Sequence, residues 1–325
     1  MAKSFGWDSR IGRRIRLRDL HILFAVVQHG SMTKAGAHLG MSQSAVSQAI
    51  AALEHALAVP VLDRTLRGVE LTIYGTALMR RGQAAFDELR SGVKDIEFLA
   101  DPEVGEVRIA CTESMAAGLL PAVIERFSLR YPKVKLDVLP VNTMLRGYAE
   151  LHERTVDLML TLSTASLERA AVEHLQNEVL FYDQLCLATA TQSPWARRRR
   201  IGLADLVDAT LLSPAPDTPG GTAVREAFRA AGLPMPQVAV TTFSVHVRNL
   251  LSMSGRFITV LPVSILRFDP GRYALKELPL ELPMSRLPVF MATLKDRTLS
   301  PAVERFMACT RDVAKAMQTP ARKSA

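Results

Sequence analysis

The chain has 325 residues, of which 48% are hydrophobic and 22% are charged, and its formal net charge is +8. This length allows two or three domains with separate cores, and the apolar content excludes general disorder. The sequence contains no run of about 18 apolar residues that could span a membrane, and it begins without the apolar segment of a secretory signal. We therefore expect a cytoplasmic globular protein whose partner is anionic.

Three cysteines, Cys111, Cys186 and Cys309, lie far apart, without the spacing of a metal site. The sequence favours reduced, buried thiols and indicates neither a metal ion nor a cofactor. A redox switch between two of the cysteines is the alternative.

The first 70 residues carry nine Lys and Arg side chains against five Asp and Glu, and six of the nine precede Leu20. Such a basic arm favours nucleic acid only when a base-reading element lies beside it. Three predicted helices follow the arm. Apolar residues recur at helical spacing from about Asp19 to Gly30, Ser31 can cap a helix over 32–39, and Ser42 can cap a third helix.

The exposed start of the third helix carries short hydrogen-bonding side chains, which suit base edges and phosphates in the major groove. The DNA contacts predicted on these helices are Ser31, Lys34, Ser42, Gln43, Ser44, Ser47 and Gln48. Residues 59–71 predict a β-hairpin whose tip carries Arg64 and Arg67, placed as a wing that contacts backbone phosphates. A three-helix packing unit without a role in DNA binding is the alternative.

Residues 18–75 contain an ordered set of segments that includes Leu20 to Val27, Gly30 to Gly36, Ser42 to Ser47, Leu53-Glu54, Leu62 to Arg64 and Leu71-Thr72. Through these segments the chain resembles the LysR-type transcriptional regulators. The family usually has Gly where Ala58 stands, Pro at Ser44 and Glu at Asp63. The resemblance implies a winged helix-turn-helix domain over residues 1–72.

Residues 73–101 predict one long helix, which Asp101-Pro102 ends. A heptad pattern places one seam on Leu78, Ala85, Gly92 and Leu99 and the other on Gly82, Leu89 and Ile96. Small seam residues allow two helices to approach closely, so we expect a linker helix that forms a homodimer. A surface helix packed on its own chain is the alternative.

Downstream of the helix, strands and helices alternate, which predicts α/β architecture with mainly parallel sheets. The strands are expected at 105–111, 133–141, 158–162, 210–214, 238–243 and 257–263, and the helices at 114–131, 144–154, 222–231 and 246–253, with a last helix from Ser300-Pro301. Crossing segments near 179–190 and 275–294 imply two lobes within residues 102–325. We expect lobe I over about 105–170 plus 275–318, and lobe II over about 171–274.

Three segments carry a second resemblance: 107–110 with 118–121, then 157–160, then Gly255 with 258–262. They are similar to the effector domain of the LysR-type regulators, a fold shared with two-lobed periplasmic binding proteins, although Phe257 replaces a glycine of the family. In this fold a ligand lies between the lobes, beside strand ends and helix N-termini. The candidate effector contacts are Thr112, Glu113, Ser114, Asn142, Thr143, Thr161, Ser244 and His246.

Ser114 and Thr143 match by position the hydroxyls with which the family contacts effectors, although Ser and Thr at helix starts are equally often plain caps. A lone histidine such as His246 is more often structural. Hydroxyls beside helix N-termini predict a small anion, for which we expect a carboxylate. Strand-like alternation would turn Glu113 away from the cleft, whereas an inward Glu113 would favour an uncharged or cationic effector.

The resemblance implies a dimer that reads two half-sites in double-stranded promoter DNA, a tetramer of two such dimers, a small-molecule effector and contact with RNA polymerase. The sequence contains no nucleophile elbow, P-loop, HExxH or paired-carboxylate motif, so it does not predict an enzyme. A free-standing solute-binding protein and an enzyme assembled in the cleft are the rival interpretations. The DNA-reading segment opposes the first, and the lack of a nucleophile–base pair opposes the second.

Overall fold

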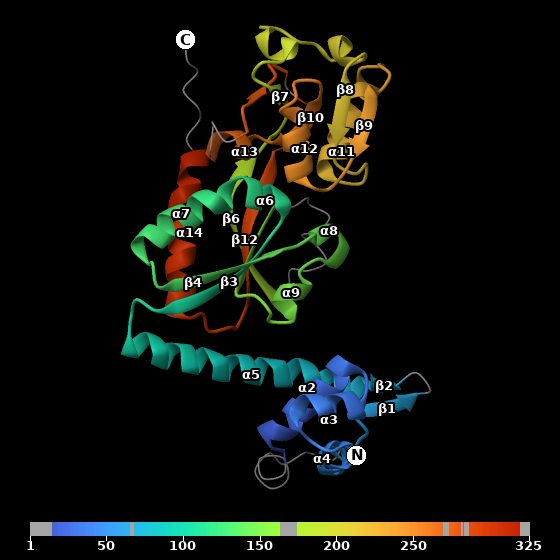
Figure 1. The fold of residues 1–325 in the computed structure, drawn as a ribbon, viewed down its shortest axis with the longest axis vertical. Helices are drawn as coiled ribbons and strands as arrows, with labels where there is room; N and C mark the ends of the chain where they lie inside the picture. Colours follow the sequence, from blue (N-terminus) through green and yellow to red (C-terminus); the bar gives the residue numbers. More distant parts are fainter. Residues whose placement is uncertain are drawn as a thin grey trace. The chain divides into compact units, whose positions relative to one another are not determined.

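The computed structural model describes residues 15–65, 68–162, 174–268, 273–280, 282 and 286–318. The chain divides into two compact units, of which the first extends to Arg90 and the second begins at Ser91. The first unit is a winged helix, and the second is a pair of α/β lobes (Figure 1). The predicted fold class is therefore confirmed.

The first unit consists of α2 (Leu17–His29), α3 (Met32–Leu39), α4 (Gln43–Leu57), β1 (Leu62–Thr65), β2 (Gly68–Leu71) and most of α5 (Ile73–Ala100). Helix α2 begins two residues earlier than the pattern indicated, because the carboxylate of Asp19 accepts the N–H of Arg16. The predicted caps are confirmed, since Ser31 accepts the N–H of Lys34 and Ser42 that of Ala45.

Two local contacts fix α4 against its neighbours. A Cβ on Gly36 would lie 2.7 Å from the carbonyl oxygen of Met41, so only glycine lets α3 approach the turn into α4 this closely. On the far side, Oε1 of Glu54 accepts the N–H of Val61 at 2.8 Å and that of Leu62 at 3.2 Å. These bonds fasten the start of the β-hairpin to α4.

Helix α5 begins at the cap Thr72, whose Oγ1 accepts the N–H of Gly75 at 3.0 Å. Part of the predicted heptad seam is wrong. Leu78 packs on the winged-helix core, and a Cβ on Gly82 would lie 2.9 Å from the Phe24 ring, so these positions contact the helix's own chain. In the single chain, Leu89, Ile96 and Leu99 of the seam are 51%, 67% and 80% exposed.

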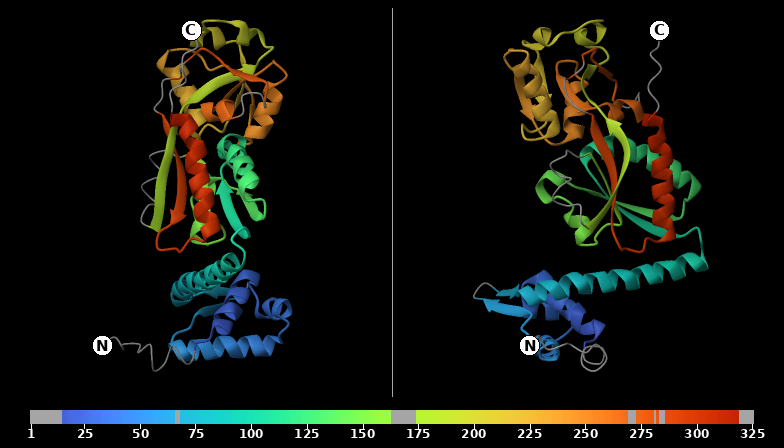
Figure 2. Two further views of the ribbon diagram at one scale, coloured as in Figure 1. Left: turned by 90° about the vertical axis from the view of Figure 1, so that its left-hand side faces the viewer. Right: turned by 180° about the vertical axis from the view of Figure 1, so that it is seen from behind.

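Lobe I is built on a five-stranded sheet in the order β4-β3-β5-β12-β6. Its strands are β3 (Gly105–Cys111), β4 (Val134–Pro140), β5 (Leu158–Leu162), β6 (Leu175–Asp183) and β12 (Leu287–Leu294). The first three are mutually parallel, and β12 runs antiparallel to β5 and β6. Helices α7 (Leu119–Arg130) and α14 (Pro301–Gln318) cover one face (Figures 1 and 2), where Phe127 and Phe306 pack edge to face.

Lobe II has a sheet in the order β11-β7-β10-β8-β9. Its strands are β7 (Leu185–Ala190), β8 (Thr210–Ser213), β9 (Gln237–Thr241), β10 (Ile258–Pro262) and β11 (Leu275–Glu277). Helix α11 (Pro219–Ala230) packs on one face, whereas α12 (Val245–Ser252) and α13 (Val263–Phe268) pack on the other. The short 3-10 helices η3 (Pro194–Arg197) and η4 (Leu203–Leu206) lie between β7 and β8.

Both crossings between the lobes lie within the predicted segments 179–190 and 275–294, but the sheets place the boundaries of the lobes differently from the prediction. Strand β6, which begins at Leu175, belongs to the lobe I sheet, and β11, which begins at Leu275, belongs to the lobe II sheet. The chain changes sheets at Gln184, and it returns between Glu277 and Leu287. The predicted boundary near residue 170 is wrong because β6 and β7 follow each other without a turn, so the apolar pattern does not show which sheet β6 joins.

Two predicted helices are each broken at a glycine. The segment 114–131 forms α6 (Glu113–Ala117) and α7, separated by Gly118, and the segment 144–154 forms α8 (Thr143–Arg146) and α9 (Ala149–His152). Gly147, between the last two, has φ +58°, which ends α8. Both breaks lie beside the predicted effector residues.

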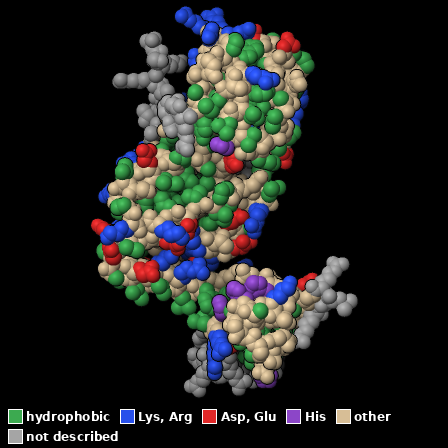
Figure 3. Space-filling model, viewed as in Figure 1, with side chains coloured by type: hydrophobic (Ala, Val, Ile, Leu, Met, Phe, Trp, Pro, Cys, Tyr) green, Lys and Arg blue, Asp and Glu red, His purple; other side chains and the backbone are tan. Residues whose placement is uncertain are grey.

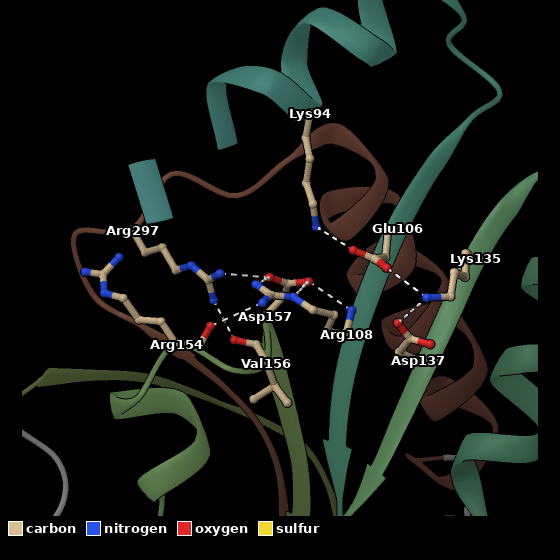
Figure 4. Close-up of polar contacts among 9 residues, drawn as sticks. All are labelled: Lys94, Glu106, Arg108, Lys135, Asp137, Arg154, Val156, Asp157 and Arg297. Atoms are coloured by element: carbon tan, nitrogen blue, oxygen red, sulfur yellow. Dashed lines mark hydrogen bonds and ion pairs between the residues drawn. The ribbon is translucent and has the colours of Figure 1, made fainter. Parts of the chain in front are cut away.

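A buried ion-pair network closes the end of lobe I from which β3 and β5 begin (Figure 4). The carboxylate of Asp157 accepts Nη2 of Arg108 at 2.6 Å and Nη2 of Arg297 at 2.8 Å, and Asp157 and Arg297 are nearly inaccessible to water. Burial alone would raise the pKa of Asp157, but the hydrogen bonds and charges of Arg108 and Arg297 outweigh it and hold this pKa below its ordinary value. The network joins β3, β5 and the segment after β12.

We expect Asp157→Asn to lower the free energy of unfolding by about 3 kcal/mol, because it leaves the buried guanidinium of Arg297 and the partly buried one of Arg108 without their counter-charge. Asp312→Asn, in an exposed pair with Lys315, should leave it nearly unchanged, because water and salt screen this pair. Urea unfolding of the two variants measures both.

The contribution of Asp157 to stability depends on pH. Since the folded-state pKa of Asp157 is lowered, this contribution is present above the unfolded pKa and disappears as the pH falls through the folded pKa. Equal stability of the two variants at pH 7 would contradict the role of Asp157.

Ala58 ends α4 in the left-handed conformation, with φ +56°. This conformation costs a residue with a Cβ about 1 kcal/mol, so Ala58→Gly should stabilise the winged helix by about that amount. Ala52→Gly, at an exposed position inside α4, should instead destabilise it by about 1 kcal/mol. Thermal unfolding distinguishes the two, and a lower Tm for Ala58→Gly would refute the strain.

Candidate functional sites

The predicted DNA-contacting residues cluster at the start of α3 and α4. Lys34, Gln43, Ser44 and Gln48 are exposed, and Ser31 and Ser47 are half-buried. Ser42 is exposed, but its hydroxyl caps α4 and lies 2.9 Å from that of Ser44. The side chain of Arg64, all of Arg67 and residues 1–14 of the basic arm lie outside the described part. Which of these residues contact DNA stays a prediction.

A cavity of about 340 Å³ opens between the two lobes of the second unit. Lobe I contributes the loop from β3 into α6, the end of β4 and the start of α8. Lobe II contributes β10, the start of α11 and the inner face of α12. Most of the wall is apolar: Pro140, Val141, Met144, Leu162, Leu185, Pro214, Pro219, Phe243, Val245, Val260, Leu261 and Pro262.

Five of the eight predicted effector residues line this cavity: Thr112, Glu113, Ser114, Asn142 and Thr143. The other three do not. The hydroxyl of Thr161 is turned to the carbonyl of Leu162, Ser244 caps α12 by accepting the N–H of Val247, and His246 is exposed. Near these three positions, the residues that line the cavity are Leu162, next to Thr161, and Val245 and Arg248 on the inward face of α12.

Arg248, which the sequence analysis missed, projects from α12 into the cavity wall and is only 4% exposed. Its Nη1 donates to the carbonyl of Thr242 at 2.6 Å, while its Nε has no acceptor among the described residues. Burial lowers the pKa of Arg248 to about 10, partly offset by the charge of Glu113, so the guanidinium stays protonated at neutral pH. The available signal was its spacing, three residues after Val245 on the same helix face.

The expected orientation of Glu113 is wrong. Glu113 is the first residue of α6 rather than part of an extended loop, so strand alternation does not apply, and it lines the cavity. Its Oε2 accepts the N–H of Val245 at the start of α12, at 2.5 Å. This bond crosses from lobe I to lobe II and occupies the N-terminus of α12 with a carboxylate.

The other polar groups differ in whether they are already used. Asn142 is a cap, because its Oδ1 accepts the N–H of Met144 at 3.0 Å. Thr112 precedes α6 without capping it, and its buried Oγ1 has no hydrogen-bond partner among the described residues. Thr112 therefore has a free hydroxyl for a ligand.

Known proteins match both units. Residues 100–315 match the family model described as LysR substrate binding domain, and residues 17–76 match the model of bacterial regulatory helix-turn-helix proteins of the lysR family. The chain belongs to the LysR family. Its members are transcription regulators, so the predictions of a DNA-binding regulator and of a chain that is not an enzyme are confirmed.

Individual relatives align with the LysR chain over most of its length. The transcriptional regulator GbpR of Azospirillum brasilense is 25% identical over 299 residues, which are 92% of this chain and 86% of that protein. The SDS degradation transcriptional activation protein of a Pseudomonas species is 29% identical and covers 89% and 93%. The crystal structure of CbnR, a LysR family regulator, has a TM-score of 0.60 at 20% identity and covers 92% and 99%. CbnR in complex with its target DNA has a TM-score of 0.59, also at 20% identity, and covers 92% and 100%.

Other surface features carry less information. Arg197 to Arg200 are exposed at the end of lobe II where Lys and Arg side chains gather (Figure 3), and Arg198 lies 4.6 Å over the Trp195 ring. No group of His, Cys, Asp and Glu within the described ranges is arranged to hold a metal ion. Within the same ranges, no helix is both long and apolar enough to cross a membrane.

The three thiols of this LysR protein lie in apolar surroundings. Cys111 and Cys186 are buried in β3 and β7, and Cys309 is half-buried on α14. Burial, with the charge of Glu113, raises the pKa of Cys111 to about 11, and burial raises the pKa of Cys186 and Cys309 as well. Each thiol is therefore mostly protonated and weakly nucleophilic at neutral pH.

We expect hydrogen peroxide to leave the DNA affinity of the protein unchanged, because the reactive thiolate form is scarce. A thiol reagent at pH 7 should modify the half-exposed Cys309 first and reach Cys111 and Cys186 only on unfolding. Gel-shift assays and mass spectrometry after peroxide treatment measure these effects. A peroxide-dependent change in affinity that a Cys→Ser substitution abolishes would establish a redox switch instead.

Proposed function

We propose that this LysR family regulator binds promoter DNA as a homodimer and changes its DNA binding when a small molecule occupies the interlobe cavity. The observation that carries this proposal is the presence, in one chain, of a capped helix with a polar exposed face and of a two-lobed domain with a cavity. Neither feature alone implies regulation. Together they supply a reader of DNA and a site that a metabolite can bias.

For DNA binding, α4 is the element that would enter the major groove. Gln43 and Ser47 lie one turn apart on it, and glutamine and serine hydrogen-bond to base edges. Arg64 and Arg67 on the β-hairpin and the arginines before α2 would contact phosphates. CbnR, which has the same fold, is known in complex with its target DNA, and that supports this docking.

For assembly, the exposed seam residues Leu89, Ile96 and Leu99 of α5 would be covered by the same helix of a second copy. A dimer would read two half-sites, and two dimers would assemble into a tetramer on one promoter. RNA polymerase is the further partner implied, and the cytoplasm is the compartment where such a regulator works.

For regulation, a ligand that contacts both walls of the cavity would favour the closed arrangement of the lobes over the open one. The shift in population is limited by the difference in the ligand's affinity for the two arrangements. A thermal-shift screen of metabolites on the full chain would identify ligands, because a ligand of the native state raises the Tm.

The test of the DNA-reading surface separates specificity from affinity. Gln43→Ala or Ser47→Ala should lower affinity for the operator by about tenfold or more and hardly affect unrelated DNA. Arg64→Ala should weaken both and reduce the slope of log affinity against log salt by about 1. Gel-shift or fluorescence titrations at several salt concentrations measure these effects. Equal losses on both DNAs for all three variants would remove α4 from the role of reader.

A further inference from the structure

The interlobe cavity carries one charge of each sign. Among the described residues that line it, Glu113 and Arg248 are the ionisable ones. Glu113 comes from α6 in lobe I and Arg248 from α12 in lobe II, and the charge of Glu113 raises the pKa of Arg248. They do not form an ion pair within 4 Å, so each can still bind an opposite charge.

Arg248 has unused capacity for a carboxylate. One guanidinium nitrogen, Nη1, is taken by the carbonyl of Thr242, and neither Nε nor Nη2 has an acceptor among the described residues. A planar guanidinium binds a carboxylate through two parallel hydrogen bonds, and the gain is largest where water is excluded. The unpartnered hydroxyl of Thr112, on the opposite lobe, is a further donor for the same group.

Glu113 has unused capacity for a cation. Its Oε2 accepts the N–H of Val245, and its Oε1 has no donor among the described residues. An ammonium group is a compact donor of three hydrogen bonds, which suits a single carboxylate oxygen.

The two charges together discriminate among ligand classes. A plain carboxylate would gain Arg248 but lie near the negative charge of Glu113, and a plain amine would gain Glu113 but lie near the positive charge of Arg248. A molecule with both groups gains both, and it leaves no buried charge without a partner. The rest of the wall is apolar, and a volume of about 340 Å³ is at the small end of ligand pockets.

We infer that the effector of this protein is a zwitterionic amino acid with an apolar side chain, its carboxylate on Arg248 and Thr112 and its ammonium on Glu113. This inference rests on the proposed function, in which the cavity holds the effector. The ligand bridges the lobes, since its two charged groups are bound by residues of different lobes.

Calorimetric titration of the full chain tests the inference with sets of three ligands that share one side chain. For leucine the set is L-leucine, 4-methylpentanoate and 3-methylbutylamine, and for phenylalanine it is L-phenylalanine, 3-phenylpropanoate and 2-phenylethylamine. L-valine, L-isoleucine and L-methionine complete the series. We expect at least one amino acid to bind at least tenfold more tightly than its analogue without the amine and its analogue without the carboxylate.

Two variants assign the charges. Glu113→Gln keeps an acceptor for the N–H of Val245 and should reduce the preference for the amino acid over its deaminated analogue to less than about threefold. Arg248→Met should reduce the preference for the amino acid over the amine, which lacks the carboxylate, to less than about threefold. Glu125→Gln, an exposed carboxylate on α7, and His246→Ala, an exposed residue on α12, are the matched controls and should leave every affinity unchanged.

Each contrary result has a distinct meaning. Equal affinity of the wild type for an amino acid and its deaminated analogue overturns the inference, and so does a lack of binding by all five amino acids at millimolar concentration. If another class of metabolite then alters the binding of operator DNA, the proposed function stands and the inference fails. If no small molecule alters DNA binding, the proposed function fails first. If the wild type prefers the amino acid over its deaminated analogue and Glu113→Gln keeps that preference, the assignment of the ammonium site is overturned.

Discussion

The interlobe site depends on how the chain passes from one sheet to the other. At the end of β6, Oδ1 of Asp183 accepts the N–H of Gln184 at 2.8 Å and that of Ser264, in α13 of lobe II, at 3.2 Å. The carbonyl of Gln184 accepts the N–H of Val263 at 2.8 Å. These bonds hold the crossing strand against the end of β10. The residues next to it, Leu185 and Pro262, line the cavity, so this crossing between the lobes is also part of the cavity wall.

Asp183 is itself a buried carboxyl group whose pKa is raised, chiefly by desolvation, although hydrogen bonds and the charge of Arg267 act in the opposite direction. A charge that is poorly solvated tolerates little displacement of the N–H groups that compensate it. We therefore expect a rotation of the lobes that changes the width of the cleft to keep these bonds. Such a rotation would also act on the hydrogen bond between Glu113 and Val245, which crosses the same cleft.

The features that the sequence predicted are those with local causes. Ser31 and Ser42 cap helices because a hydroxyl three residues before a free N–H needs no tertiary partner. The strand 105–111 follows from apolar residues that alternate with Glu106 and Arg108, and the strand 158–162 follows from a short, mostly apolar run. The failures have distant causes. Strand β6 joins the lobe I sheet through pairing with β12, more than 100 residues away, and Arg248 became a site residue only because α12 packs on β10. Among hydroxyls and amides at helix starts, Asn142 and Ser244 are used as caps and Thr112 is not, a difference that depends on three-dimensional contacts rather than on residue type.

A movement of lobe I has a route to the last turns of α5, within the second unit. Lys94 pairs with Glu106 on β3 at 3.4 Å (Figure 4), and Nη1 of Arg305, on α14, donates to the carbonyl of Pro102 at 2.7 Å. The same guanidinium lies over the rings of Phe98 and Tyr131, at 4.7 and 5.1 Å. Because these contacts flank the short connection from α5 to β3 on both sides, the end of α5 follows lobe I rather than swinging freely. Within the second unit, a change in lobe I would therefore act on the last turns of α5 through contacts separate from the residues that line the cavity.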